Sequence, residues 1–233
     1  MTETANALPH LLREAEQHSW TYQELLVALC SHEEKLREEK TTQKHLKWAQ
    51  FPFEKSLEDF NTLGQSALSN RQINQLKEFV WLKQAFNLIF LGPPGVGKTH
   101  IAIGLGLAAI HKGKQVSFVS MAELVSLLKT ESYVRRSELR LRRIRKADLV
   151  IIDDMMFMAM ETNEANLFFQ LVSDLYEKSS IILTSNKGPD NWSKMLGDQG
   201  IATAILDRLL HRCEVIHMGG ESYRMKHRQS MFT

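Results

Sequence analysis

Residues 86–99 read FNLIFLGPPGVGKT, and this stretch decides the fold class of the 233-residue chain. Its first half is a short apolar run of the kind that forms a buried strand. Its second half, Gly92–Thr99, matches the phosphate-loop spacing G-x-x-x-x-G-K-T, and a helical pattern follows it. The glycines permit positive φ angles and close backbone approach, and the helix adds the positive end of its dipole. The stretch therefore predicts a strand, a nucleotide-binding loop and a helix, in that order.

The loop supplies the first candidate site residues. We expect Lys98 to reach the β- and γ-phosphates of a nucleotide, and the Thr99 hydroxyl to ligate Mg²⁺. A chance Gly/Pro turn is the alternative, but a match to all four defined positions of this eight-residue pattern, between a strand and a helix, favours nucleotide binding. The residues predicted to bind the nucleotide are Gly92, Pro93, Pro94, Gly95, Val96, Gly97, Lys98, Thr99 and His100.

Apolar strand-like runs alternate with helical patterns along the chain on the C-terminal side of the loop. The runs lie at residues 114–120, 147–153, 179–186 and 213–218. Strands separated by helices indicate an α/β fold with a five-stranded parallel sheet that is covered on both faces. Ligands of such sheets bind beyond the carboxyl ends of the strands, so polar residues at strand ends are the next candidates.

Two such ends carry polar side chains. The third strand ends in Asp153, which we expect to hold Mg²⁺ together with Thr99, and Asp154 is placed to orient or deprotonate an attacking water. The fourth strand is followed by Asn186, which can hydrogen-bond that water and the γ-phosphate. The alternatives are a strand-end turn for the two aspartates and a helix cap before Pro189 for the asparagine.

A basic segment precedes the third strand. On a helix, Val134, Leu141 and Ile144 would share a buried face while the cations point outward. Such a cluster neutralises DNA phosphates without reading sequence, although charge runs are more often a solvated face. The predicted DNA-binding residues are Arg135, Arg136, Arg140, Arg142, Arg143, Arg145 and Lys146.

Two other features have open interpretations. Arg208 and Arg212 precede the last strand, and either is a candidate arginine finger for a neighbouring subunit's nucleotide or an ordinary surface arginine. The apolar run Met155–Met160 follows the acids directly. It packs into the core beneath the next helix, or it offers an adaptable contact to another subunit or a partner protein.

Composition and the N-terminal region bound the remaining possibilities. A hydrophobic content of 43% and a net charge of +2 fit a soluble globular protein. Two distant cysteines, no apolar run of about 18 residues and no leader pattern favour a cytoplasmic protein without a membrane partner. Residues 1–50 are expected to be a helical module, because Thr21 and Glu24 have the capping-box spacing that begins a helix. The expected role of this module is subunit or partner contact. Residues 51–65 are expected to be a linker, and 66–233 the nucleotide-binding domain.

The motifs together resemble one family over nearly the whole chain. LGPPGVGKTHIAIGLG, DLVIIDD, EANLFFQLVSDLYE, ILTSN, ILDRLLHR and the tail motif GESYR are similar to those of IstB-like proteins. These are the ATP-binding helper proteins of insertion sequences, within the AAA+ class of P-loop ATPases. The resemblance implies ATP and Mg²⁺ as cofactors, assembly on duplex DNA by head-to-tail contacts, and recruitment or regulation of a transposase encoded by the same element.

The resemblance also assigns roles to individual residues. It implies that Lys98 and Thr99 are the Walker A residues and that Asp153 is the Walker B acid. Asp154 corresponds to the catalytic position, Asn186 to sensor 1 and Arg208 to the arginine finger. The segment Leu57–Phe60 resembles the one that flanks the adenine.

The sequence departs from the family pattern in two places. Many relatives have Glu at the position of Asp154, so hydrolysis of ATP is expected to be slow. A lid domain is expected to be reduced or absent, which leaves Arg224 without an assigned role. The alternatives are a DnaC-like replicative helicase loader and a nucleotide-gated adaptor with little hydrolysis.

Overall fold

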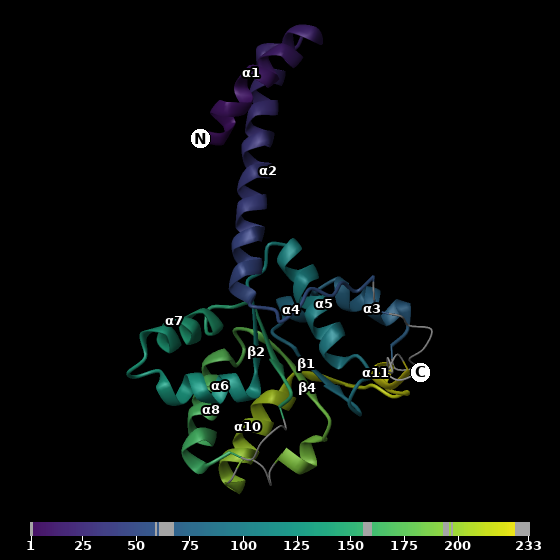
Figure 1. Ribbon diagram of the computed structural model, residues 1–233, viewed down its shortest axis with the longest axis vertical. Coiled ribbons are helices and arrows are strands. Elements are labelled where there is room, and N and C mark those ends of the chain that lie inside the picture. The colour runs from purple at the N-terminus through teal and green to yellow at the C-terminus, as the bar shows by residue number, and fades with distance from the viewer. Residues whose placement is uncertain are drawn as a thin grey trace, which may run out of the picture. The chain divides into compact units, whose positions relative to one another are not determined.

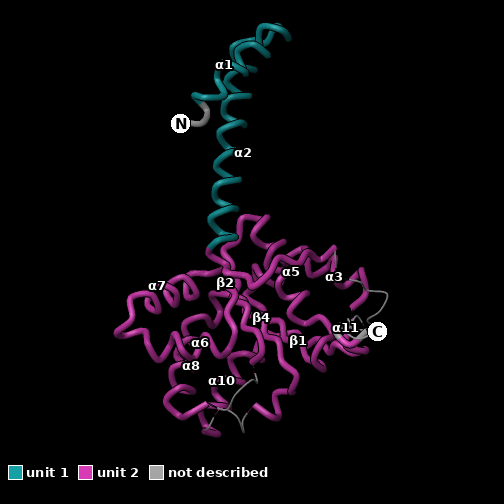
Figure 2. The backbone as a smooth tube through the Cα atoms, in the orientation of Figure 1, with its two compact units in different colours: residues 1–47 teal, residues 48–233 magenta. Residues whose placement is uncertain are grey.

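The computed structural model describes residues 2–58, 60, 68–155, 160–192, 196 and 198–226. The chain divides into two compact units, residues 1–47 and residues 48–233 (Figure 2). The first unit consists of α1 (Thr2–Gln17) and most of α2 (Tyr22–Ala49). The second contains the sheet and the remaining described helices.

The N-terminal capping of α2 is as the sequence predicts. The Thr21 backbone N–H donates to Glu24 Oε2 at 2.7 Å, and the Glu24 N–H donates to Thr21 Oγ1 at 3.3 Å. These reciprocal bonds satisfy two backbone donors that the first turn of a helix otherwise leaves unpaired. Proximity to that backbone N–H also lowers the pKa of Glu24, so the carboxylate stays charged where the helix dipole favours it.

The second unit is built on a five-stranded parallel sheet, which confirms the predicted fold class. The strand order is β2-β3-β4-β1-β5, and every neighbouring pair is parallel. Because β4 lies between β1 and β3, the loop after β1 and the acids after β3 reach the same edge of the sheet from either side of β4. The strands are β1 (Asn87–Leu91), β2 (Val116–Ser120), β3 (Leu149–Asp153), β4 (Ser180–Ser185) and β5 (Cys213–His217).

Helices cover both faces of this sheet (Figure 1). The helix α5 packs over β2, β3 and β4 on one face and carries α3 on its outer side, whereas α6, α8 and α10 pack together on the other. The helices of this unit are α3 (Asn70–Lys77), α4 (Val80–Lys83), α5 (Lys98–His111), α6 (Met121–Thr130), α7 (Arg135–Ile144), α8 (Thr162–Leu175), α10 (Gln199–His211) and α11 (Tyr223–Lys226), with a 3₁₀ turn η2 (Pro189–Asn191).

The core explains why these segments adopt these elements. Ile89 and Ile152 of the sheet join one apolar cluster with Phe168 of α8 and Ile205 of α10. On the opposite face α5 is apolar almost all round, as expected of a helix with protein on every side. Burial of this apolar surface is the main free energy that holds the strand ends in a fixed arrangement.

The region before β1 contains two helices instead of one. The helical pattern of residues 70–83 is interrupted at Phe79, whose φ is 57°. The Phe79 side chain is buried, and the left-handed turn redirects the backbone between α3 and α4. Tertiary burial of one aromatic ring thus outweighs helical propensity at this position.

The described part of the expected linker packs onto the nucleotide-binding domain. Leu57 and Phe60 are buried, and a Cβ atom at Gly104 of α5 would lie 2.7 Å from Leu57 Cδ2. At Gly106 a Cβ would lie 2.9 Å from the Phe51 ring. The two glycines therefore form a groove on α5 that holds this segment, instead of leaving it as a free connection.

The described residues beyond β5 include one short helix, α11. None of the helices in the described ranges is long and apolar enough to cross a bilayer.

Candidate nucleotide site and nucleic-acid interface

The phosphate loop has the backbone geometry that anion binding requires. Gly95 and Gly97 adopt φ angles of 84° and 96°, which side chains with a Cβ atom disfavour. Gly97 is the N-cap residue of α5, so the free N–H groups of the first helical turn lie at the loop. Val96 of the loop is fully buried, so this part of the loop is packed against the rest of the domain.

Lys98 lies inside this loop. Its side chain is buried, and its Nζ atom donates to the carbonyl oxygens of Gly92 and Pro93 at 2.8 and 2.9 Å. The ammonium group is thereby fixed on the concave side of the loop, where phosphate oxygens would replace or join these carbonyls. This is the position that the sequence assigns to the Walker A lysine.

The structure brings Thr99 and Asp153 together across 54 residues of sequence. Thr99 Oγ1 donates to Asp153 Oδ1 at 2.8 Å. Because the hydroxyl proton is directed to the carboxylate, the oxygen lone pairs of Thr99 remain for a cation. A hydroxyl beside a carboxylate at the phosphate end of the loop fits Mg²⁺, which prefers a few oxygen ligands and retains several waters.

Burial shapes the titration of Asp153. Removal from solvent raises the pKa of this carboxyl group above its ordinary value, and hydrogen bonds from Thr184 and Thr99 oppose the rise. A divalent cation beside the carboxylate would favour its charged form.

Asp154 and Asn186 follow the adjacent strands β3 and β4, and both are exposed. The backbone of Asp154 is left-handed, with a φ of 55°. This turn separates the directions of the two acids, since Asp153 remains in the strand while Asp154 leaves it. The two polar residues are thus available at the edge where the phosphate loop ends, as the sequence predicts.

The tail motif contacts the phosphate loop, a feature that the sequence did not predict. The Tyr223 N–H donates to the Gly95 carbonyl at 3.0 Å, and a Cβ atom at Gly95 would lie 2.1 Å from Ser222 Oγ. Upstream, the Met218 N–H donates to the Leu91 carbonyl at 2.6 Å. Gly95 is therefore required for the tail as well as for the loop turn. The side chain of Arg224 lies outside the described residues.

His100 connects the loop helix to the segment that was expected to flank the adenine. Its Nε2 atom lies 2.8 Å from the Ser56 carbonyl, and its ring meets the Phe60 ring edge-on at 5.4 Å. Leu57 and Phe60 are thus held beside the start of α5. Their position is compatible with a role next to a nucleotide base.

The two candidate arginine fingers lie near the amino ends of the strands, whereas the phosphate loop begins at their carboxyl ends. Arg208 Nη1 donates to the Ala204 carbonyl at 2.9 Å, and its guanidinium lies 4.6 Å from the Phe169 ring centroid. Arg212 is more exposed and reaches the Gln84 carbonyl at 3.4 Å. Five residues of β1 separate these ends by roughly 15 Å, so neither arginine is placed to act on the nucleotide of its own subunit.

The basic helix α7 differs from the prediction at Arg140. This residue is 5% exposed, and its guanidinium donates to Ser117 Oγ, to the Phe118 carbonyl and to the Trp48 carbonyl. The prediction that Arg140 binds DNA is therefore wrong. Its position explains why, because Ser137, Arg140, Leu141 and Ile144 recur at helical spacing and all four are buried.

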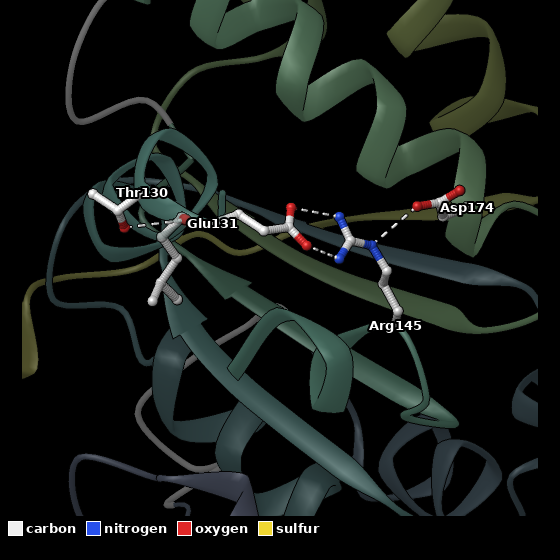
Figure 3. Close-up of polar contacts among 5 residues, drawn as sticks. Thr130, Glu131, Arg145 and Asp174 are labelled. Atoms are coloured by element: carbon white, nitrogen blue, oxygen red, sulfur yellow. Dashed lines mark hydrogen bonds and ion pairs between the residues drawn. The ribbon is translucent and has the colours of Figure 1, made fainter. Parts of the chain in front are cut away.

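Arg145 also forms ion pairs with side chains of its own domain. It makes a bidentate pair with Glu131 at the end of α6, and its Nε donates to Asp174 of α8 at 3.0 Å (Figure 3). Two carboxylates neutralise this guanidinium, so the prediction that it contacts DNA is not supported. The hydrogen bond from Arg145 holds the pKa of Glu131 below its ordinary value.

The remaining cations of the segment are exposed. Leu141 and Ile144 are buried as predicted, whereas Val134 is exposed because the helix begins after it. The Arg143 guanidinium lies 5.2 Å from the Trp48 ring centroid and remains exposed. The candidate nucleic-acid interface, called the α7 cation face below, is Arg135, Arg136, Arg142, Arg143 and Lys146.

The methionine run is buried at both ends. Met155 is fully buried and Met160 is 5% exposed. Both belong to the apolar cluster beneath α8 and α10, which favours core packing for these two residues. Met156 and Met158 lie outside the described residues.

Comparison with known proteins agrees with this geometry. The model of the family "IstB-like ATP binding protein" matches residues 1–231. A Pseudomonas aeruginosa protein described as an ATP-binding protein of insertion sequence IS21 is 39% identical over 219 residues, covering 94% of this chain and 83% of the relative. A Geobacillus stearothermophilus protein described as an ATP-binding protein of insertion sequence IS5376 is 35% identical over 215 residues, covering 92% and 86%.

Solved structures share the fold at lower identity. The similarity to DnaI has a TM-score of 0.59 at 19% identity, covering 73% of this chain and 90% of DnaI. The DnaC helicase loader gives a TM-score of 0.55 at 19% identity, covering 70% of this chain and 96% of the loader. These likenesses support the AAA+ P-loop fold, and the family match over nearly the entire chain identifies the protein as a member of the IstB-like ATP-binding proteins of insertion sequences.

Proposed function

We propose that this protein is an ATP-dependent DNA-binding transposition helper, which assembles on duplex DNA and recruits or regulates a transposase. The observation that carries the proposal is the joining of Lys98, Thr99 and Asp153 at one edge of the sheet, in a chain that also presents the α7 cation face. The first feature suits a nucleotide with Mg²⁺, and the second suits a polyanion.

Each residue of the nucleotide site has a distinct part in the proposed hydrolysis of ATP. Lys98 and the loop amides bind the phosphates, and Thr99 with Asp153 would hold Mg²⁺, which supplies positive charge against the developing phosphate charge. Asp154 orients or deprotonates the attacking water, and Asn186 hydrogen-bonds it. The Asp154 side chain is one methylene shorter than that of Glu and reaches less far toward the attacking water, so we expect slow turnover.

The α7 cation face would give affinity without sequence specificity. Four of its side chains lie on α7 and Lys146 follows the helix, and Arg140 and Arg145 fix this segment to the domain. A rigid row of cations releases counterions from duplex DNA, and binding then weakens steeply with salt. Contacts to phosphates rather than to base edges position the protein without reading sequence.

The position of Arg208 and Arg212 supports the proposed head-to-tail assembly. Because both lie at the edge opposite the phosphate loop, either arginine would complete the site of a neighbouring subunit. Arg208 is held by its own helix and by Phe169, whereas Arg212 is more exposed, so we expect Arg212 to contribute at least as much as Arg208.

A mixing experiment tests the ATPase and its assembly together. We expect wild-type protein to release phosphate from ATP, and faster with duplex DNA. Lys98→Ala and the double variant Arg208→Ala/Arg212→Ala are each expected to be inactive alone. Mixed together, they are expected to regain part of the activity, because one supplies an intact nucleotide site and the other the arginines. Absence of phosphate release by the wild type with DNA would favour a nucleotide-gated adaptor instead.

A partner assay separates the transposition helper from a helicase loader. We expect the protein with ATP and duplex DNA to retain the transposase of its own insertion sequence on immobilised DNA. Retention of a replicative helicase on single-stranded DNA, without retention of the transposase, would contradict the proposal. The similarity to DnaC does not decide between these functions, since at 19% identity it supports the fold alone.

A further inference from the structure

Thr184 lies within the nucleotide site, although the phosphate loop and the acid pair do not include it. It is a fully buried residue of β4. The ladder between β3 and β4 ends with the pair Ile152 and Leu183, so Thr184 lies one residue beyond it, beside the end of β3. Its surroundings are therefore the two acids.

One hydroxyl group of Thr184 contacts both acids. Thr184 Oγ1 donates to Asp153 Oδ1 at 2.5 Å and accepts the backbone N–H of Asp154 at 3.0 Å. A hydroxyl has one proton and two lone pairs, so it satisfies both contacts at once. The Thr184 carbonyl also accepts the N–H of Met155 at 3.0 Å. A single residue thus contacts the last residue of β3 and the two residues that follow it.

The backbone of Asp154 depends on such support. Its left-handed φ of 55° is uncommon for residues with a Cβ atom. The chain turns sharply here, since Asp154 is exposed while Met155 is fully buried. Holding the Asp154 N–H therefore fixes the direction in which the Asp154 carboxylate leaves the sheet.

The same hydroxyl also fixes the carboxylate of Asp153. Its Oδ1 atom accepts hydrogen bonds from the hydroxyl groups of both Thr184 and Thr99. Two donors on one oxygen hold the plane of the carboxylate and keep it beside the Thr99 oxygen. Loss of one donor would loosen the pair of residues that the proposed function assigns to Mg²⁺.

We propose that Thr184 is a positioning residue. Its hydroxyl group fixes Asp153, which would hold Mg²⁺, relative to Asp154, which would orient or deprotonate the attacking water. The inference rests on the proposed ATP hydrolysis and adds to it a residue that orients both acids. Thr184 acts through Asp153 and Asp154, and its loss is expected to affect turnover and use of Mg²⁺ more than binding of the phosphates by the loop.

Variants that differ by one hydroxyl test this role. Thr184→Val keeps the shape and removes the hydroxyl, whereas Thr184→Ser keeps the hydroxyl. Thr184→Ala differs from Thr184→Ser only by that oxygen, and provides the comparison if the valine variant is poorly folded. Ser180→Ala is a matched control, because Ser180 lies on the same face of β4 and its buried hydroxyl has no hydrogen-bond partner among the described residues.

Three measurements are compared on the full chain. Binding of a fluorescent ATP analogue is titrated with and without Mg²⁺, steady-state phosphate release gives kcat and KM, and thermal unfolding checks folding. We expect Thr184→Val and Thr184→Ala to lower kcat by about tenfold or more, with KM changed less than about threefold. Their nucleotide binding without Mg²⁺ is expected to remain, while the gain from Mg²⁺ is largely lost.

The serine variant and the control are expected to stay close to wild type in all three measurements. Equal kcat and equal Mg²⁺ dependence for wild type and Thr184→Ala would overturn the inference. So would equal loss in Thr184→Ser and Thr184→Ala, because the hydroxyl would then be irrelevant. If wild-type protein binds ATP but releases no phosphate, the proposed hydrolysis fails, and the Mg²⁺ titration alone decides the role of Thr184.

Discussion

The nucleotide edge of the sheet and the basic helix α7 were both predicted from short stretches of sequence, with different success. At the edge, the structure joins Lys98, Thr99 and Asp153 in the arrangement that the spacing requires. In the basic segment, Arg140 of α7 and Arg145 just after this helix are bound within the protein. The difference teaches that a motif with fixed spacing predicts the position of each side chain, whereas a run of like charges predicts only an average property of a surface.

The largest expected effect concerns the nucleotide edge. Replacing Lys98 by Ala removes an ammonium group that is held inside the loop. Two charge-assisted hydrogen bonds to phosphates of about 1.5–3 kcal/mol each predict a loss of ATP affinity of roughly 10²- to 10⁴-fold. Fluorescence titration with an ATP analogue measures it. Lys178→Ala, at an exposed position after α8, is the control, and unchanged affinity of Lys98→Ala would refute the assignment of the loop.

The next largest effect sharpens the contrast within α7. Arg140→Ala leaves buried acceptors on β2 without a donor, and we expect a loss of about 2–3 kcal/mol in the free energy of unfolding. Arg142→Ala, two residues away and exposed, is expected to leave stability within about 0.5 kcal/mol of wild type. Chemical denaturation of both variants provides the comparison. Equal stability would mean that Arg140 belongs to the surface after all.

A smaller effect is expected for single residues of the α7 cation face. Each lost phosphate contact should reduce the slope of log K against log salt by about 0.9 for duplex DNA. Arg136→Ala and Arg142→Ala are therefore expected to weaken duplex binding and to flatten its salt dependence, without a change in ATP affinity. Fluorescence anisotropy at several salt concentrations measures the slope. An unchanged slope in the double variant Arg136→Ala/Arg142→Ala would show that α7 does not contact the DNA.

The smallest effect belongs to the ion pairs in Figure 3. Glu131→Gln weakens a partly exposed pair with Arg145, and we expect a loss of about 0.5–1 kcal/mol of stability at neutral pH. Since the pKa of Glu131 is lowered in the folded state, this contribution is complete above the ordinary value of 4.5 and disappears as the pH falls below it. The wild type and the variant should thus converge in stability in acid. A constant difference down to low pH would exclude the ion pair as its cause.

The sheet was predictable because each strand is a short apolar run with a polar residue or glycine at its end. All five strands lie where the alternation of strands and helices placed them, and the parallel sheet followed from that alternation. The break at Phe79 was not predictable from helical periodicity, because it depends on the burial of one ring against the rest of the domain.

The same division applies to the site. Thr99 and Asp153 could be paired from the two motifs, since parallel strand ends meet at one edge. The hydroxyl of Thr184 and the contact of Tyr223 with Gly95 join residues far apart in the sequence. The motifs ILTSN and GESYR contain Thr184 and Tyr223 but do not indicate which residues they contact. For Arg140 a pattern was present, because it shares helical spacing with Leu141 and Ile144. Because Arg140 is charged, it was predicted to be exposed although its spacing indicates the buried face.

In the proposed function, ATP at the phosphate loop controls binding of DNA at the α7 cation face. Fluorescence anisotropy of a labelled duplex, titrated with wild-type protein in ATP with Mg²⁺, in ADP and without nucleotide, tests it most directly. We expect tight binding only with ATP, and its loss in both Lys98→Ala and the Arg136→Ala/Arg142→Ala variant. Equal binding under all three nucleotide conditions would contradict the claim.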